Sequence, residues 1–483
     1  MNEEIAEYYE ELYRLYIDEN QPLERRYRQL RESLERVVRE RIQGDSLQTT
    51  DLAARINYVA TQYGLDIKEQ NQLHTFRLTS NDILNHRKFP AKEEFLRDLR
   101  AVAFAYRKMF AQDIPLKLFS VLPKQEITSL GKKEKKEYIR RIRVCFDYAD
   151  DTYLYVHPVD IIADEPIRVV YNKPGINHEF EETIKELWRY AQLNLLDVFV
   201  DREGIYTPSF IVLEPDYLID ISSLAECYKD YGSHPANYFL SRLVPIDNAR
   251  PLLLGNIANL FLDEWIHAGE EEPDYIDCMK KAFRQYPIEL AACAELRDPS
   301  KEKEFAKDCR MHFEHIRDIV QHTFLEPGYN LDKKDAVLEP SYICEALGIQ
   351  GRLDYMQRDM SSFIEMKSGK ADEFSIQGKV EPKENNKVQM LLYMAVLEYS
   401  MGQDRRRMHP YLLYTRYPLL YPARASWAQV RRVINLRNRI VAAEYGVQFH
   451  NHSDFTRNLL AQINPEVMNE RKLRGKFWEQ YLK

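Results

Sequence analysis

The sequence predicts an α/β protein in which a helical region and a β-rich region precede a mixed α/β region. Three observations support this fold class: helical spacing of apolar residues in 1–115, short β-rich runs in 116–216, and a hairpin followed by a long helix within 217–450. The remaining segment, 451–483, is expected to be a helical extension. A length of 483 residues fits about three domains.

The composition is that of an ordinary globular protein, with 45% hydrophobic and 30% charged residues and a net charge of −8. We expect no signal peptide, because the N-terminus is acidic, and no membrane partner, because no apolar run reaches the length of a membrane span. The six cysteines lack a framework spacing, which favours a reducing intracellular compartment.

Apolar stripes, caps and stop signals place several helices in 1–115. Thr50 or Asp51 is expected to cap a helix that ends at Gly64, and Pro90 to begin another that ends near Phe110. This region is either a partner-binding bundle or a packing appendage, and the second interpretation is favoured.

Alternating β-rich runs in 116–216 predict a small barrel or half-barrel with one helix near Glu181 to Leu195. A basic cluster precedes and enters these runs. Such a barrel could hold single-stranded nucleic acid, but a solvated charge run explains the cluster equally well. The cluster consists of Lys132, Lys133, Lys135, Lys136, Arg140, Arg141 and Arg143.

Two short apolar runs joined by a polar turn predict a β-hairpin, Gly351–Met356 paired with Ser362–Lys367. Side chains alternate between the faces of a strand, so Glu365 and Lys367 should point the same way. Ile364 and Met366 should occupy the other face. Asp354 lies on the partner strand, within reach of Glu365.

A helix is predicted from Glu384 to Met401, with Gly402 as its stop. Gln389 and Tyr393 stand four residues apart on this helix, so both should reach from one face toward the hairpin.

The residue types suggest phosphodiester hydrolysis. Two adjacent carboxylates, Asp354 and Glu365, repel each other, and a hard cation such as Mg²⁺ relieves that repulsion while it binds substrate phosphate. Such an ion activates water and polarises phosphate, and Lys367 can orient water or offset developing charge.

The ordered set Gly351-x-x-Asp354, Glu365-x-Lys367 and Gln389-x-x-x-Tyr393 resembles the PD-(D/E)XK nuclease superfamily, and more narrowly its RecB-like branch. The resemblance implies a restriction-endonuclease-like core and a Mg²⁺- or Mn²⁺-dependent DNase on single strands, flaps or ends. It assigns catalytic roles to all five polar residues, Asp354, Glu365, Lys367, Gln389 and Tyr393, and metal binding to Asp354, Glu365 and the backbone carbonyl of Met366.

Two segments depart from that branch. Leu254 to Glu264 resembles the helix whose His binds metal in relatives, but Asn259 occupies the His position, and Asp263 or Glu264 is an alternative. His234-Pro235 stands where iron–sulfur members carry Cys-Pro, and no cysteine follows Cys344. We therefore expect no iron–sulfur cluster, which needs about four thiolates.

Segments flanking the motif, such as Asn435 to Arg439, resemble the nuclease region of bacterial flap-processing helicase–nucleases. This resemblance implies DNA repair, replication or recombination in the cytoplasm, associated with the nucleoid, and a helicase motor in cis or in trans. This chain itself has no Walker A motif. Candidate phosphate contacts are Arg352, Lys370, Arg416 and Arg437, although solvated surfaces explain such arginines equally well.

Two other functions remain open. One is a catalytically silent nuclease fold that clamps DNA for a helicase, and the other is a structural assembly platform formed by the N-terminal helices.

Overall fold

The structure is a computed structural model. It describes all residues except 1–2, 43–50, 124–137, 162, 164, 229–232, 245–249, 375–378, 425, 450–456, 458–460, 462–470 and 482–483. The chain divides into two compact units, the first Met1–Glu214 with Val441–Phe455 and the second Pro215–Ile440 with Thr456–Lys483. The mixed α/β class is confirmed.

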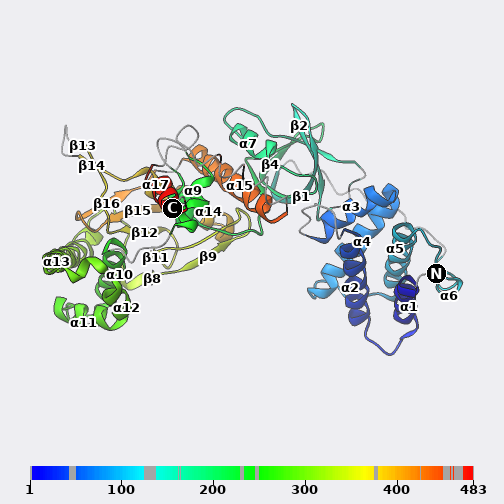
Figure 1. The fold of residues 1–483 in the computed structure, drawn as a ribbon, viewed down its shortest axis with the longest axis horizontal. Helices are drawn as coiled ribbons and strands as arrows, with labels where there is room; N and C mark the ends of the chain where they lie inside the picture. The colour runs from blue at the N-terminus through cyan, green and yellow to red at the C-terminus, as the bar shows by residue number, and fades with distance from the viewer. Residues whose placement is uncertain are drawn as a thin grey trace. The chain divides into compact units, whose positions relative to one another are not determined.

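The first unit begins with a group of helices (Figure 1). Local caps define the third of them, as expected: the Asp51 side chain accepts the N–H of Ala54 at 2.9 Å, and Gly64 ends the helix with a φ of 63°. The six helices are α1 (Glu3–Ile17), α2 (Leu23–Ile42), α3 (Leu52–Tyr63), α4 (Ile67–Leu84), α5 (Lys92–Phe110) and α6 (Leu116–Phe119).

A six-stranded sheet follows in the order β1-β2-β3-β5-β4-β6, and β1 also pairs with β4. The pairings of β1, β2, β3, β5 and β4 therefore return to their first strand. The elements are β1 (Tyr138–Ala149), β2 (Tyr153–Pro158), β3 (Ile167–Val170), η1 (His178–Phe180), α7 (Glu181–Lys185), β4 (Gln192–Val200), β5 (Tyr206–Thr207) and β6 (Phe210–Leu213).

The helix expected from Glu181 to Leu195 is wrong in extent. It ends at Lys185, and the apolar run that follows is the strand β4, which pairs with β1, β5 and β6. A short apolar run has no decisive periodicity, so long-range pairing determined its conformation.

Helices and sheet of the first unit share one core. Cys145, Val159 and Tyr190 belong to the same buried cluster as the helical residues Tyr27, Phe76 and others. Gln192 also donates to the Asp51 carboxylate at 3.0 Å, so the N-terminal cap of α3 is tied to β4. The lysines of the predicted basic cluster lie outside the described residues.

A buried carboxyl group among these helices should make the stability of the first unit depend on pH. Asp98 is 3% exposed, and its Oδ2 accepts the Tyr27 hydroxyl at 3.0 Å. Burial raises the pKa of Asp98 to about 7, above its value in an unfolded chain, so its contribution to stability is complete below about pH 4 and is lost as the pH rises through 7. Asp98→Asn should flatten the decline in the unfolding midpoint between pH 5 and 8. Equal slopes in chemical denaturation of both proteins would contradict this.

The second unit contains two groups of helices. Those before the motif strands are α8 (Ile221–Glu226), α9 (Ala236–Leu243), α10 (Arg250–His267), α11 (Tyr275–Gln285), α12 (Pro287–Ala292), η2 (Ala294–Arg297), α13 (Pro299–Gln321), η3 (Thr323–Leu325) and η4 (Lys333–Asp335). Those after them are α14 (Glu384–Met401), η5 (Arg405–Arg407), α15 (Trp427–Phe449), whose last residues belong to the first unit, and α17 (Arg471–Tyr481).

Three sheets accompany these helices, ordered β16-β15-β12-β11-β8, β7-β10-β9 and β13-β14. Their strands are β7 (Ile219–Asp220), β8 (Ala336–Leu338), β9 (Ser341–Cys344), β10 (Ile349–Arg352), β11 (Tyr355–Gln357), β12 (Ser362–Lys367), β13 (Asp372–Phe374), β14 (Lys379–Glu381), β15 (His409–Tyr414) and β16 (Leu419–Pro422).

The five-stranded sheet has helices on both faces (Figure 1). Ile364 and Met366 of β12 join a core with α10 and α13, whereas α14 packs against β15. Strand β12 pairs in parallel with β15, and α14 connects them. This arrangement leaves the alternate residues of β12 on the face that α14 covers. No helix among the described residues is long and apolar enough to cross a membrane.

The predicted hairpin forms, but its first strand is divided. β11 pairs antiparallel with β12, whereas β10, just before it, pairs with β7 and β9 in another sheet. Asp354 lies at the switch between the two sheets. The predicted helix matches α14, which ends at Gly402 with a φ of 71°.

Candidate active site

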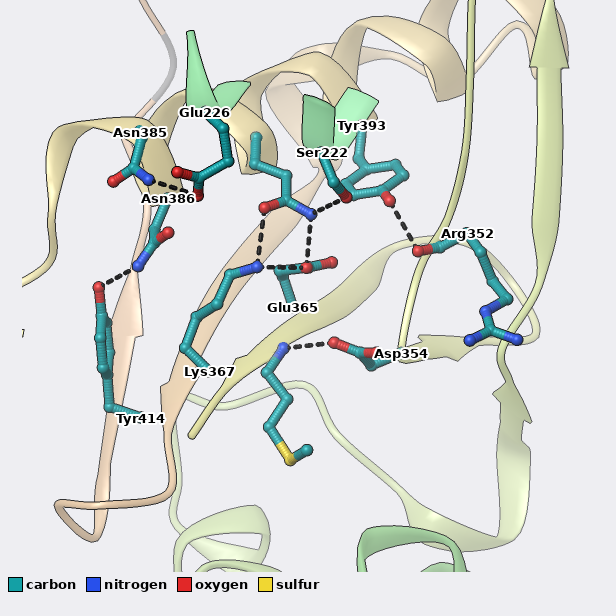
Figure 2. A network of polar contacts seen from close by, with 12 residues as sticks. Ser222, Glu226, Arg352, Asp354, Glu365, Lys367, Asn385, Asn386, Tyr393 and Tyr414 are labelled. Carbon is teal, nitrogen blue, oxygen red and sulfur yellow. Dashed lines mark hydrogen bonds and ion pairs between the residues drawn. The ribbon is translucent and has the colours of Figure 1, made fainter. Parts of the chain in front are cut away.

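Asp354 is held at the switch between β10 and β11 by the neighbouring strand. Its Oδ2 accepts the backbone N–H of Met366 at 2.6 Å (Figure 2). Because Met366 directly follows Glu365 on β12, this bond places the Asp354 carboxylate beside the Glu365 position. The two carboxylates of the sequence motif thus come from adjacent strands.

Glu365 has one satisfied oxygen and one orphaned oxygen. Its Oε1 accepts bonds from Gln389 Nε2 at 2.6 Å and from Lys367 Nζ at 2.9 Å (Figure 2). The Oε2 is buried and has no hydrogen-bond partner among the described residues. Since a buried, unpaired carboxylate oxygen is costly, Glu365 Oε2 is the atom of the site that most needs a ligand.

Electrostatics inside the site favour a cation. Burial raises the pKa of both Asp354 and Glu365, and the charge of Asp354 raises that of Glu365 further. Burial alone would lower the pKa of Lys367, but the two carboxylates raise it. Lys367 therefore stays protonated, and its single charge faces two carboxyl groups.

Gln389 positions Glu365 and Lys367 relative to each other. Its Oε1 accepts from Lys367 Nζ at 2.8 Å, while its Nε2 donates to Glu365 and, at 2.9 Å, to the Ser222 hydroxyl. With 3% of its surface exposed, Gln389 orients the other two side chains, and its catalytic role stays a prediction. Ser222, on α8, was missed as a site residue, because the sequence indicated only a helix start there.

Tyr393 holds the backbone just before Asp354. It is fully buried, and its hydroxyl donates to the backbone carbonyl of Arg352 at 2.6 Å. Gly351 permits this approach, since a Cβ there would lie 3.0 Å from the Tyr393 hydroxyl and 3.1 Å from Ile221. The ring therefore fixes the strand that leads to Asp354, and a catalytic role for Tyr393 stays a prediction.

Replacing Tyr393 tests this positioning role. Tyr393→Phe leaves the Arg352 carbonyl without its donor, which should lower the free energy of unfolding by about 1 kcal/mol, and Tyr393→Ala should cost about 3–5 kcal/mol. Chemical denaturation measures both. A Phe variant with wild-type stability but greatly weakened DNA affinity would contradict the structural role.

Other acidic residues surround the pair without forming a cluster. Glu339 donates its backbone N–H to the Asp354 carbonyl at 3.1 Å and forms an ion pair with Arg352 at 3.1 Å. Burial, reinforced by Glu339, raises the pKa of Asp263 to about 6. Asn259, one turn earlier on α10, forms no hydrogen bond with Asp354 or Glu365 in the described part of the chain.

The donor set fits a hard divalent cation held by two carboxylates. The buried Oε2 of Glu365 has no hydrogen-bond partner among the described residues, and a bound cation would supply a partner for it. Among the described residues, no group of three or more Cys, His, Asp or Glu side chains is arranged to hold a metal. Roles for Asn259 and for the Met366 carbonyl as further ligands stay predictions.

The four basic residues expected to contact phosphate differ in their surroundings. Arg352 and Lys370 are exposed, the first paired with Glu339, and Arg416 lies in the turn after β15, partly buried. Arg437 is fully buried, and its guanidinium donates to the carbonyls of Tyr217 at 2.5 Å and Gly348 at 3.2 Å. A phosphate role for Arg437 is therefore wrong.

A cavity of about 370 Å³ adjoins the site at Lys367. It is bounded by the end of α8, the loop after β12, the first turn of α14 and Tyr414 of β15. Figure 2 shows Asn385, Asn386 and Tyr414 on the side of Lys367 away from Tyr393.

No protein-family model matches the sequence, and no curated protein matches it. The function therefore rests on the residues and the geometry of the site.

Proposed function

We propose that the chain is a divalent-cation-dependent nuclease with a PD-(D/E)XK-type core, in which Asp354 and Glu365 hold Mg²⁺ or Mn²⁺. The observation that carries this proposal is the buried, unpartnered Oε2 of Glu365 beside a second carboxylate whose pKa is raised by burial. A purely structural pair would be expected to find a hydrogen-bond donor or a cationic partner for that oxygen.

A divalent cation at this position supplies positive charge that polarises a phosphodiester and activates water for attack. Lys367 then acts as the neighbouring positive charge, either orienting the water or offsetting charge that develops on the phosphate. Gln389 holds the Lys367 and Glu365 side chains in fixed positions through hydrogen bonds of 2.8 and 2.6 Å. Preorganised groups of this kind need no rearrangement during the reaction, which favours catalysis.

The proposed substrate is DNA, in single strands, flaps or ends, and this part of the proposal rests on the resemblance described above. Helicase partnership and a cytoplasmic, nucleoid-associated role belong to the same proposal. The closed order of pairings in the first unit supports the barrel-like domain expected there, with β6 extending it along β4.

A cleavage assay tests the proposed function. Labelled single-stranded DNA, duplex DNA, flap DNA and RNA are incubated with Mg²⁺, with Mn²⁺ or with chelator. We expect metal-dependent, sequence-independent cleavage that prefers single-stranded DNA and falls steeply with salt. Retention of DNA without cleavage in any metal would instead support the silent binding module.

A further inference from the structure

The cavity beside Lys367 is lined by three lysines and three carboxylates, which differ in the partners they already have. Lys367, Lys370 and Lys383 line it, together with Glu226, Asp372 and Glu384. Glu226 accepts a bond from Asn385 at 2.7 Å, and Glu384 is bonded to Gln429 and paired with Lys387 at 3.5 Å. Glu384 is therefore neutralised by a lysine, whereas Glu226 keeps its charge and is fixed by an amide.

The cavity lysines differ from these carboxylates in their partners. Neither Lys370 nor Lys383 forms an ion pair or a side-chain hydrogen bond among the described residues, and both are exposed. Lys367 alone is engaged, with Glu365 and Gln389. Two uncommitted ammonium groups therefore remain to bind an anion that enters the cavity.

The first turn of α14 adds a second attraction for an anion. Lys383 is the N-cap of this helix, and it forms no side-chain cap with the first backbone N–H groups. A helix N-terminus carries a partial positive charge and presents N–H donors, both of which favour phosphate. Asn386 is held by the Tyr414 hydroxyl at 2.6 Å, so the turn that borders the cavity is fixed.

We infer that this cavity binds the nucleotide next to the scissile phosphate, with its outer phosphate between Lys370, Lys383 and the first turn of α14. The inference rests on the nuclease function proposed for the adjoining carboxylates. A volume of about 370 Å³ suits one nucleotide, at the small end of the range for ligand sites.

The probe for this subsite is deoxythymidine 3′,5′-bisphosphate, titrated calorimetrically into the full chain in the presence of chelator. We expect binding that thymidine, which lacks phosphate, does not reproduce. Lys370→Ala and Lys383→Ala should each weaken binding about tenfold, since each removes a charged contact. Lys280→Ala is the matched control, because Lys280 is a lysine of α11 that pairs with Asp277 at 2.7 Å and does not line the cavity.

Two results would overturn the subsite: no binding of the bisphosphate by the wild-type protein at millimolar concentration, or equal affinity in the wild type, Lys370→Ala and Lys383→Ala. Thermal melting of each variant shows that a loss of affinity is not a loss of fold. The chelator keeps this test independent of cleavage, so bisphosphate binding without nuclease activity would retain the subsite and reject the proposed function. Cleavage without bisphosphate binding would retain the proposed function and reject the subsite.

Discussion

Glu365→Gln is expected to abolish metal-dependent cleavage, with a fall in rate of at least about 10³-fold, because a neutral amide replaces a charged ligand of the cation. The substitution keeps the shape of the side chain. An amide oxygen can still accept the bonds now made by Gln389 Nε2 and Lys367 Nζ. Single-turnover cleavage of a labelled single strand measures the effect.

The same variant should fold at least as well as the wild type when no metal is present. The pKa of Glu365 is raised to about 8 by burial and by Asp354, above its value in an unfolded chain. Its contribution to stability is therefore complete below about pH 4.5 and is lost as the pH rises through 8. In chelator, Glu365→Gln should lessen the decline of the melting temperature over this range.

Glu314→Gln provides a matched control. Glu314 is a carboxylate on α13 that forms an ion pair with Arg310 and no contact with Asp354 or Glu365 among the described interactions. It should cleave at the wild-type rate. Undiminished, metal-dependent cleavage by Glu365→Gln would reject the role given to this residue.

Lys367→Met should reduce the cleavage rate by about 10²-fold or more while cation binding is retained or strengthened. Methionine removes the ammonium group but keeps an unbranched chain of similar length. Without Lys367, the charges of Asp354 and Glu365 are opposed only by a bound cation, which raises its affinity. Mn²⁺ titration and single-turnover kinetics separate the two effects.

If Mn²⁺ binding disappears together with activity, Lys367 shapes the carboxylate pair and does not act on the phosphate. Lys280→Met is the corresponding control, because Lys280 is a lysine of the same unit that pairs with Asp277 on α11. It should change neither the rate nor the affinity for the cation.

Local signals in the sequence predicted the elements that position the site. The stop of α14 at Gly402 depends on one residue that adopts a positive φ, and the alternation along β12 follows from strand geometry. Glu365 and Lys367 accordingly share a face, opposite the core formed by Ile364 and Met366.

The features that could not be predicted from the sequence depend on packing between segments that are distant along the chain. Arg437 is buried because Gly348, at a φ of 64°, leaves the space that a side chain would fill: a Cβ there would lie 2.3 Å from the guanidinium. Ser222 approaches the site from a segment distant in sequence, and no periodicity marks it. The strand β4 was misinterpreted for the same reason.

Calorimetric titration of Mn²⁺ into the wild-type protein, Asp354→Asn and Glu365→Gln tests the central claim most directly, because it measures the carboxylate pair without a substrate. We expect the wild type to bind Mn²⁺ and each variant to lose at least about tenfold in affinity while keeping its fold by circular dichroism. Mn²⁺ binding of equal strength in all three proteins would contradict it.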